Sequence, residues 1–203
     1  MMTAFNEGKV IERTVRSVLN TGYANVEVLV TAFEAWPLPD EPFDAVVAAT
    51  AFHWIDPAVR VPKAARALRP GAALVVLDYS HYEGFRMGPR SAAAERVFRA
   101  VGESFRRHGG NPDVGMDVPR HMHAAGLEVR SVRPLVRVGR PGSALWEWPR
   151  TFFQIFLPTL VADGSLSAAG HAEFWEDYDA RSADPAAFFM SPPMVEVIGV
   201  RTA

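Results

Sequence analysis

Two short segments of this 203-residue chain combine histidine with aromatic side chains, and each directly follows an apolar run. Residues 50–54 read Thr-Ala-Phe-His-Trp, and residues 78–82 read Asp-Tyr-Ser-His-Tyr. An imidazole exchanges protons near neutral pH. On position alone, His53 is therefore the best-placed general base and His81 is the second. The chemistry suggested is proton transfer at an aromatic-lined site.

The elements around these segments bring both to one edge of a sheet. The apolar runs that precede them, residues 43–49 and 72–77, are typical of strands buried on both faces. Between the runs, Asp56-Pro57 starts a helix and Arg69-Pro70-Gly71 ends it. Two buried strands joined by a helix run parallel, as a right-handed βαβ unit, and ligands bind beyond the carboxyl ends of such strands. Both segments therefore lie where this fold places chemistry.

The same region resembles the middle of the class I S-adenosylmethionine-dependent methyltransferases, most closely the small-molecule group described as type 11 or 12. Four elements carry the resemblance in the family's order and spacing: Pro37–Asp40, Phe43–Val47, Phe52–Asp56 and Ala67–Gly71. The similarity is close over residues 25–89 and loose beyond. It implies an α/β, Rossmann-like fold with a mostly parallel sheet and an antiparallel edge strand. It also implies S-adenosylmethionine as cofactor and a small-molecule acceptor as substrate.

Site residues follow from this resemblance. Methyl transfer from a sulfonium is an in-line displacement in which charge disappears, so it needs orientation, a dry site and sometimes a base. We expect His53 to be the catalytic base; the alternative is that it only packs or hydrogen-bonds within its loop. The expected cofactor-binding residues are Ala32, Phe33, Glu34, Thr50, Ala51 and Trp54. The expected substrate-binding residues are Tyr79, His81, Trp146 and Phe152.

The loop at residues 31–39 departs from the family pattern. The family commonly has an acidic residue here that accepts a hydrogen bond from the adenine amino group, whereas this chain has Ala32. Phe33 is expected to contact the adenine ring, with packing beneath the loop as the alternative. Trp54 and Tyr79 are expected to face the sulfonium, because aromatic faces attract cations.

The first thirty residues differ further from the methyltransferase family pattern. A complete member of the family carries a first strand ending in a GxGxG turn, yet the only glycines before residue 70 are Gly8 and Gly22. Residues 4–30 instead resemble the opening of family 2 glycosyltransferases, without the acidic nucleotide-sugar motif. We therefore expect residues 1–24 to form a helix of foreign origin, joined to an N-terminally truncated methyltransferase domain at 25–203. A chance similarity is the alternative.

Further elements are predicted downstream. Ser91 and Asp117 begin helices, and two strands, residues 127–138 and 194–200, close the far edge of the sheet as a hairpin. Between them, residues 140–193 read as a helical insert with caps at Ser143 and Ser167 and breaks at Pro149 and Pro158. We expect this aromatic-rich insert to cap the carboxyl edge and shape an apolar substrate pocket. Alternatively, its aromatic side chains only fill their own core.

Composition excludes several classes of site. The chain has no cysteine, which excludes disulfides and thiolate metal sites, and its net charge of −2 argues against nucleic-acid or anionic-membrane partners. His121 and His123 lie two residues apart and point to different sides of a helix, so no metal site is expected. No apolar run reaches membrane-spanning length, and we expect a cytoplasmic protein of undetermined oligomeric state.

Three functional hypotheses follow. The first is a methyltransferase acting on a small, apolar or aromatic metabolite. The second is a non-catalytic remnant, an interaction module that lacks the cofactor glycine loop. The third and weakest is a glycosyltransferase fragment, which rests on the first thirty residues alone.

Overall fold

The computed structural model describes residue 27, residue 29 and residues 31–202. The helix predicted at residues 1–24 lies outside this part of the chain. Within the described part, none of the helices is both long enough and apolar enough to cross a bilayer.

Among the described residues, the main sheet has four strands in the order β1-β2-β7-β4. They are β1 (Phe43–Ala49), β2 (Leu68–Tyr79), β7 (Met194–Arg201) and β4 (Leu127–Leu135). β1 and β2 run parallel, and β7 is antiparallel to both of its neighbours. The α/β fold and the closing hairpin are thus confirmed. The sheet is mixed rather than mostly parallel among the described strands, because two of its three pairings, β2–β7 and β4–β7, are antiparallel.

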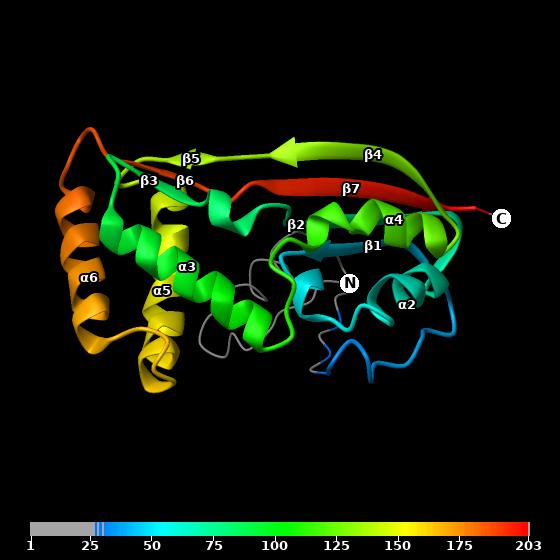
Figure 1. The fold of residues 1–203 in the computed structure, drawn as a ribbon. Coiled ribbons are helices and arrows are strands. Elements are labelled where there is room, and N and C mark those ends of the chain that lie inside the picture. Colours follow the sequence, from blue (N-terminus) through cyan, green and yellow to red (C-terminus); the bar gives the residue numbers. More distant parts are fainter. Residues whose placement is uncertain (1–26, 28, 30, 203) are drawn as a thin grey trace.

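Helices cover one face of this sheet (Figure 1). α2 (Arg60–Arg66) connects β1 to β2, and α4 (Val118–Ala124) precedes β4. Alternate strand residues such as Val46, Leu74 and Val197 point into this layer and are fully buried. On the opposite face, Val47 remains 45% exposed.

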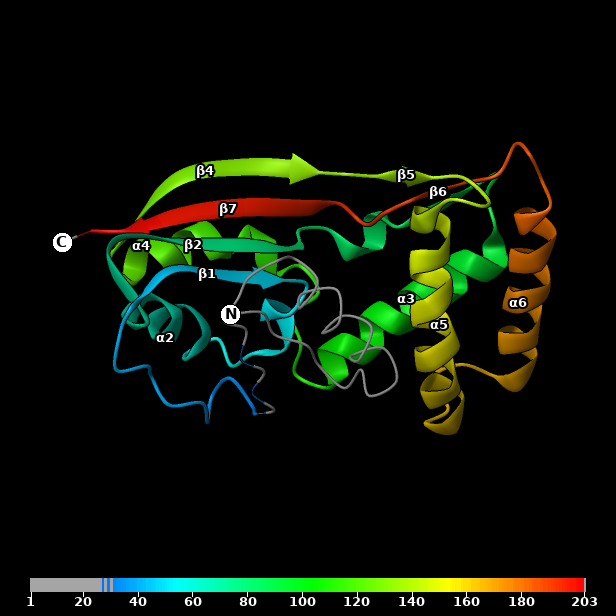
Figure 2. The ribbon, with the colours of Figure 1, turned by 180° about the vertical axis from the view of Figure 1, so that it is seen from behind.

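A second layer lies at the end of the molecule away from the C-terminus (Figures 1 and 2). Its helices are α3 (Ala92–Arg107), α5 (Ala144–Ala162) and α6 (Ala168–Ser182). Its small sheet has the order β3-β6-β5, made of β3 (Arg86–Gly88), β6 (Phe188–Met190) and β5 (Val138–Gly139). Three 3-10 helices complete the described part of the chain: η1 (Phe52–Trp54), η2 (Tyr82–Gly84) and η3 (Val114–Met116).

One antiparallel ribbon runs through both layers. β4 continues into β5 after residues 136–137, and β6 continues into β7 after residues 191–193. The gap is bridged by two hydrogen bonds, from the Ser191 backbone N–H to the Arg137 carbonyl (2.8 Å) and from the Arg137 backbone N–H to Ser191 Oγ (3.0 Å). The two sheets are therefore connected by paired backbone rather than by a single linker.

The helix starts predicted at Ser91, Ser143 and Ser167 are confirmed. The predicted start at Asp56-Pro57 and end at residues 69–71 are wrong, because α2 begins at Arg60 and residues 69–71 belong to β2. The predicted breaks in α5 are also wrong. Ser91, Ser143 and Ser167 each accept a hydrogen bond from the backbone N–H three residues on. α5, by contrast, runs without interruption through Pro149 and Pro158. Each proline removes one backbone hydrogen bond. Burial of Phe153, Leu157 and Leu160 in the aromatic core offsets that loss.

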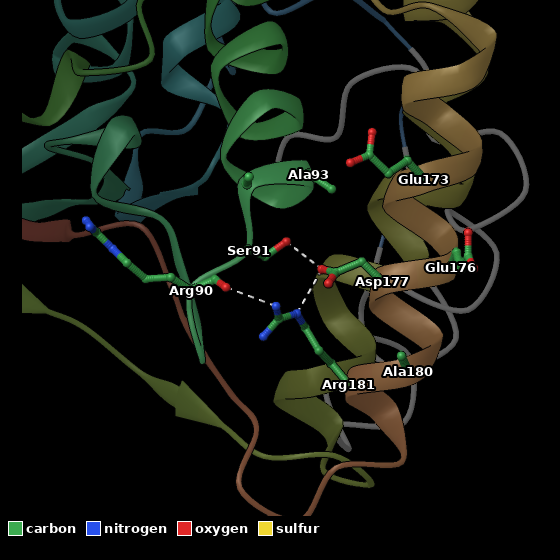
Figure 3. A pocket seen from close by; sticks show the side chains of 9 residues that line it. Arg90, Ser91, Ala93, Glu173, Glu176, Asp177, Ala180 and Arg181 are labelled. Atoms are coloured by element: carbon green, nitrogen blue, oxygen red, sulfur yellow. Dashed lines mark hydrogen bonds and ion pairs between the residues drawn. The ribbon is translucent and has the colours of Figure 1, made fainter.

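A polar cluster joins α3 to α6 beside a depression of about 470 Å³ (Figure 3). Ser91 Oγ donates to Asp177, which also accepts from Arg181 Nε at 2.8 Å. Arg181 in turn donates to the carbonyls of Pro89 and Arg90. Burial acts to raise the pKa of Asp177, but the bonds from Arg181 and Ser91 outweigh it, and the net pKa lies below the usual range.

This cluster predicts an acid-sensitive contribution to stability. Because the folded pKa of Asp177 lies below its unfolded value, the contribution is present at neutral pH and is lost as pH falls through the folded pKa. Asp177→Asn should therefore lower the unfolding temperature at pH 7. The difference in unfolding temperature between this variant and the parent chain should shrink as the pH falls below about 3.9. Thermal unfolding across pH checks this, with exposed Glu176→Gln as the control. A difference that persists unchanged into acid would contradict the assignment.

Candidate functional site

The turn after β1 holds its residues in a strained conformation. Thr50 has a backbone φ of +49°, a region that β-branched residues rarely occupy. Its N–H donates to the Leu77 carbonyl at 2.8 Å, which ties the turn to β2. The chain then passes directly into η1, which carries His53. An observed strain of this kind, at a strand end, is typical of functional sites.

The strain predicts a measurable gain on substitution. Thr50→Gly should raise the free energy of unfolding by about 1 kcal/mol, because glycine adopts positive φ without steric cost. Ala51→Gly is the matched control: its φ of −134° is ordinary, so glycine should instead destabilise the chain. Chemical denaturation measures both. Destabilisation by Thr50→Gly would show that the Thr50 side chain contributes more than the strain costs.

A buried imidazole–carboxylate pair connects η1 to the end of β2. His53 Nδ1 lies 2.8 Å from Asp78 Oδ1, and the two side chains are only 3% and 1% exposed. Asp78 also accepts from the backbone N–H of His53 at 3.3 Å and from that of Tyr79 at 2.9 Å. With Nδ1 occupied by the carboxylate, Nε2 is the ring nitrogen that remains for a ligand.

A buried arginine supports the same turn from α2. Arg60 is 2% exposed, and its Nη1 donates to the carbonyls of Phe52 and Ile55, which flank His53, at 3.1 and 3.4 Å. Its Nε has no hydrogen-bond partner among the described residues. Burial lowers the pKa of Arg60, and the Asp78 carboxylate is the largest opposing influence. The guanidinium therefore places a positive charge close to Asp78.

Aromatic rings surround His53. The ring centroids of Trp54 and Tyr79 each lie 5.2 Å from that of the imidazole, and the Phe105 ring stacks on it at 5.5 Å. Phe105 also contacts Phe152, at 6.4 Å between centroids. The structure thus brings together four of the predicted residues, His53, Trp54, Tyr79 and Phe152, the last of them through Phe105.

The predicted adenine-binding loop packs against α2. Phe33 is buried and stacks on Trp36, and Lys63 Nζ lies 5.6 Å from the Phe33 ring. Lys63 also donates to the Glu34 carbonyl at 2.8 Å, while Glu34 Oε1 accepts from the Asp56 backbone N–H at 3.1 Å. Phe33 therefore packs in the core beneath its loop. Its neighbours Ala32 and Glu34 are exposed.

Two predicted substrate-binding residues lie elsewhere. Trp146 is 1% exposed within the α5–α6 core, where its Nε1 donates to Ser182 Oγ at 3.1 Å and its ring packs on Tyr178. His81 follows β2 but is exposed, and its backbone N–H donates to Pro193. Neither ring is in contact with His53.

Sequence reasoning missed Asp78, Arg60 and Phe105 as parts of the site. Asp78 had a weak signal, as an acidic residue at the end of an apolar strand. Arg60 and Phe105 had none, because each sits in an ordinary helix pattern. Among the described residues, no group of three His, Asp or Glu side chains is arranged to hold a metal ion.

Comparisons with known proteins agree with this architecture. Residues 8–76 match a sequence family described as a methyltransferase domain. Relatives from Mycobacterium bovis and two strains of Mycobacterium tuberculosis, each named an uncharacterized methyltransferase, are 44% identical over 57 residues. That match covers 28% of this chain and 24% of each relative, so it spans about a quarter of the relatives' length.

Solved structures show the same fold. The YcgJ protein from Bacillus subtilis has a TM-score of 0.56 and 15% identity, covering all of this chain and 81% of that one. A Bacillus halodurans protein, provisionally assigned as a methyltransferase, has the same TM-score and coverages with 18% identity. The resemblance of the first thirty residues to glycosyltransferases gains no support, since the methyltransferase match begins at residue 8. About a third of the chain, residues 8–76, is thus similar to a methyltransferase domain, and the fold of the described residues is similar to that of these solved structures.

Proposed function

We propose that this chain transfers a methyl group from S-adenosylmethionine to a small-molecule acceptor, with His53 as the catalytic base. The observation that carries the proposal is the buried His53–Asp78 pair, at the carboxyl ends of the parallel strands β1 and β2. This edge is where α/β sheets bind ligands.

The residues at the strand ends suit the proposed cofactor. S-Adenosylmethionine supplies an electrophilic methyl group on a sulfonium when bound. The Trp54 ring is half-buried beside His53, and an aromatic face of this kind attracts a cation. Tyr79, Thr50, Ala51, Ala32 and Glu34 lie at the same strand ends or in the neighbouring loop. We assign these residues, with Trp54, to cofactor and acceptor binding.

The chain's own residues orient the reactants, exclude water and hold a proton. Trp54, Tyr79 and Phe105 surround the imidazole and keep its surroundings apolar, which limits competing hydration. The Asp78 carboxylate fixes the ring from the Nδ1 side. His53 Nε2 is then oriented to take a proton from the acceptor's nucleophilic atom.

Calorimetric titration of the full chain with S-adenosylmethionine and with S-adenosylhomocysteine tests the proposal. We expect saturable binding of both, weakened about tenfold or more by Trp54→Ala, since a cation–aromatic contact in a desolvated site contributes up to about 2 kcal/mol. Trp148→Ala is the matched control, because Trp148 is 39% exposed on α5 and contacts Phe189 rather than His53. No binding at millimolar ligand would overturn the proposal.

A further inference from the structure

We propose that Asp78 and Arg60 are positioning residues that hold His53 in one tautomer, and that the acceptor is accordingly an aromatic ring bearing a hydroxyl group. This inference rests on the proposed methyl transfer and specifies its substrate class. Three independent features carry it: the bonds on Asp78, the burial of Arg60 and the half-buried rings beside His53.

The bonds on Asp78 decide which imidazole nitrogen carries the proton. Oδ1 accepts from the Tyr79 N–H at 2.9 Å, and Oδ2 accepts from the His53 N–H at 3.3 Å. A carboxylate has no proton to donate, so in the 2.8 Å contact between Asp78 Oδ1 and His53 Nδ1 the ring nitrogen is the donor. The proton therefore sits on Nδ1, and Nε2 keeps its lone pair. This is the tautomer that a general base requires.

Arg60 stabilises that arrangement in two ways. Its cation is attracted by the Asp78 carboxylate, and its Nη1 donates to the carbonyls of Phe52 and Ile55, on either side of His53. Other titratable groups around the ring are the phenols of Tyr79 and Tyr82. Burial raises the pKa of Tyr82 well above its usual value, so Tyr82 stays neutral. Asp78 and Arg60 are therefore the charges that act on His53 from β2 and α2.

The rings beside His53 indicate the shape of the acceptor. Trp54, Phe152 and Phe156 are each half-buried, and all three contact Phe105, which stacks on the imidazole. Such flat apolar faces favour offset or edge-on packing of another ring. Because His53 lies beside these rings as the proposed base, the acceptor must also carry a proton that His53 can remove. An aromatic hydroxyl meets both conditions.

The step balances without any further reactant. The acceptor's O–H bond breaks and its proton goes to His53 Nε2, while the oxygen forms a bond to the methyl carbon. The methyl–sulfur bond breaks and its electron pair stays on sulfur. The products are a methyl ether, S-adenosylhomocysteine and an imidazolium, which returns its proton to water.

Two phenols of similar shape test the role of Asp78. 4-Methylphenol is neutral at pH 8 and needs a base, whereas 4-nitrophenol is already largely ionised. We expect Asp78→Asn to slow methylation of 4-methylphenol by about 10²-fold or more, and that of 4-nitrophenol by less than about tenfold. Asp44→Asn, a change at an exposed residue paired with Arg69 at the start of β1, is the control. Equal losses on both phenols would overturn the positioning role.

A spectroscopic readout is independent of turnover. Nitrogen-15 NMR of labelled histidine should show His53 with its proton on Nδ1 in the parent chain, and a mixed population in Asp78→Asn and Arg60→Met. A proton on Nε2 in the parent chain would overturn the inference. Saturable S-adenosylmethionine binding with neither phenol methylated would overturn the acceptor class alone and leave the proposed function standing.

Discussion

His53→Gln is expected to lower the methyl-transfer rate by about 10²- to 10⁴-fold, the usual contribution of a positioned general base. Glutamine keeps a polar side chain of similar reach but cannot accept a proton near neutral pH. The dissociation constant for S-adenosylmethionine should change by less than about threefold, because the aromatic faces rather than the imidazole are assigned to the cation. Single-turnover kinetics with a radiolabelled methyl group, together with calorimetry, separate the two quantities.

The matched control is His81→Gln. His81 follows the neighbouring strand but is exposed, with its backbone bonded to Pro193. The His81→Gln variant should leave both the methyl-transfer rate and the affinity for S-adenosylmethionine unchanged. If His53→Gln keeps its full rate, or if His81→Gln loses as much, then His53 is a structural residue of its turn and the base lies elsewhere.

Phe153→Ala should have the largest effect on stability and lower the free energy of unfolding by about 3–5 kcal/mol. Phe153 has no exposed surface, and its ring contacts those of Phe98 from α3 and Phe174 from α6 at centroid distances of 5.7 and 5.2 Å. Removing the ring leaves a cavity where three helices meet. Because domains of this size are stable by only about 5–15 kcal/mol, much of the helical layer's stability depends on this side chain.

Urea denaturation followed by circular dichroism measures the change. Ile155→Ala on the same helix is the control, since Ile155 is 46% exposed and should cost within about 0.5 kcal/mol. Similar midpoints for the two variants would mean that the aromatic core repacks around the missing ring.

The local pattern of the sequence was sufficient to predict the carboxyl ends of β1 and β2 and the position of His53 shortly after β1. Apolar runs and the helix between them specify a βαβ unit, and the unit specifies an edge. The three serine caps were equally local, because each bond spans three residues. What depends on spacing along the chain was therefore predictable.

Contacts between distant residues were not predictable. Asp78 is bonded to a ring 25 positions earlier, and only the parallel register of β1 and β2 brings the two together. Arg60 occupies a position that a helix pattern assigns to solvent, yet it is buried beneath η1. Trp146 was expected near the substrate because it is aromatic. Trp146 instead packs in the core of the second layer. The prediction of helix breaks at the two prolines of α5 was wrong for the same reason, since tertiary packing offset the loss of backbone hydrogen bonds.

The ribbon that passes from β4 into β5 and back from β6 into β7 restricts how the molecule can open. Two crossing strands, held together by Ser191 and Arg137, resist bending far more than one flexible connector. Rigid-body hinging of the helical layer away from the sheet is therefore disfavoured. Small molecules should enter the strand-end site through rotamer changes and local shifts of the turns, which are faster than domain motion.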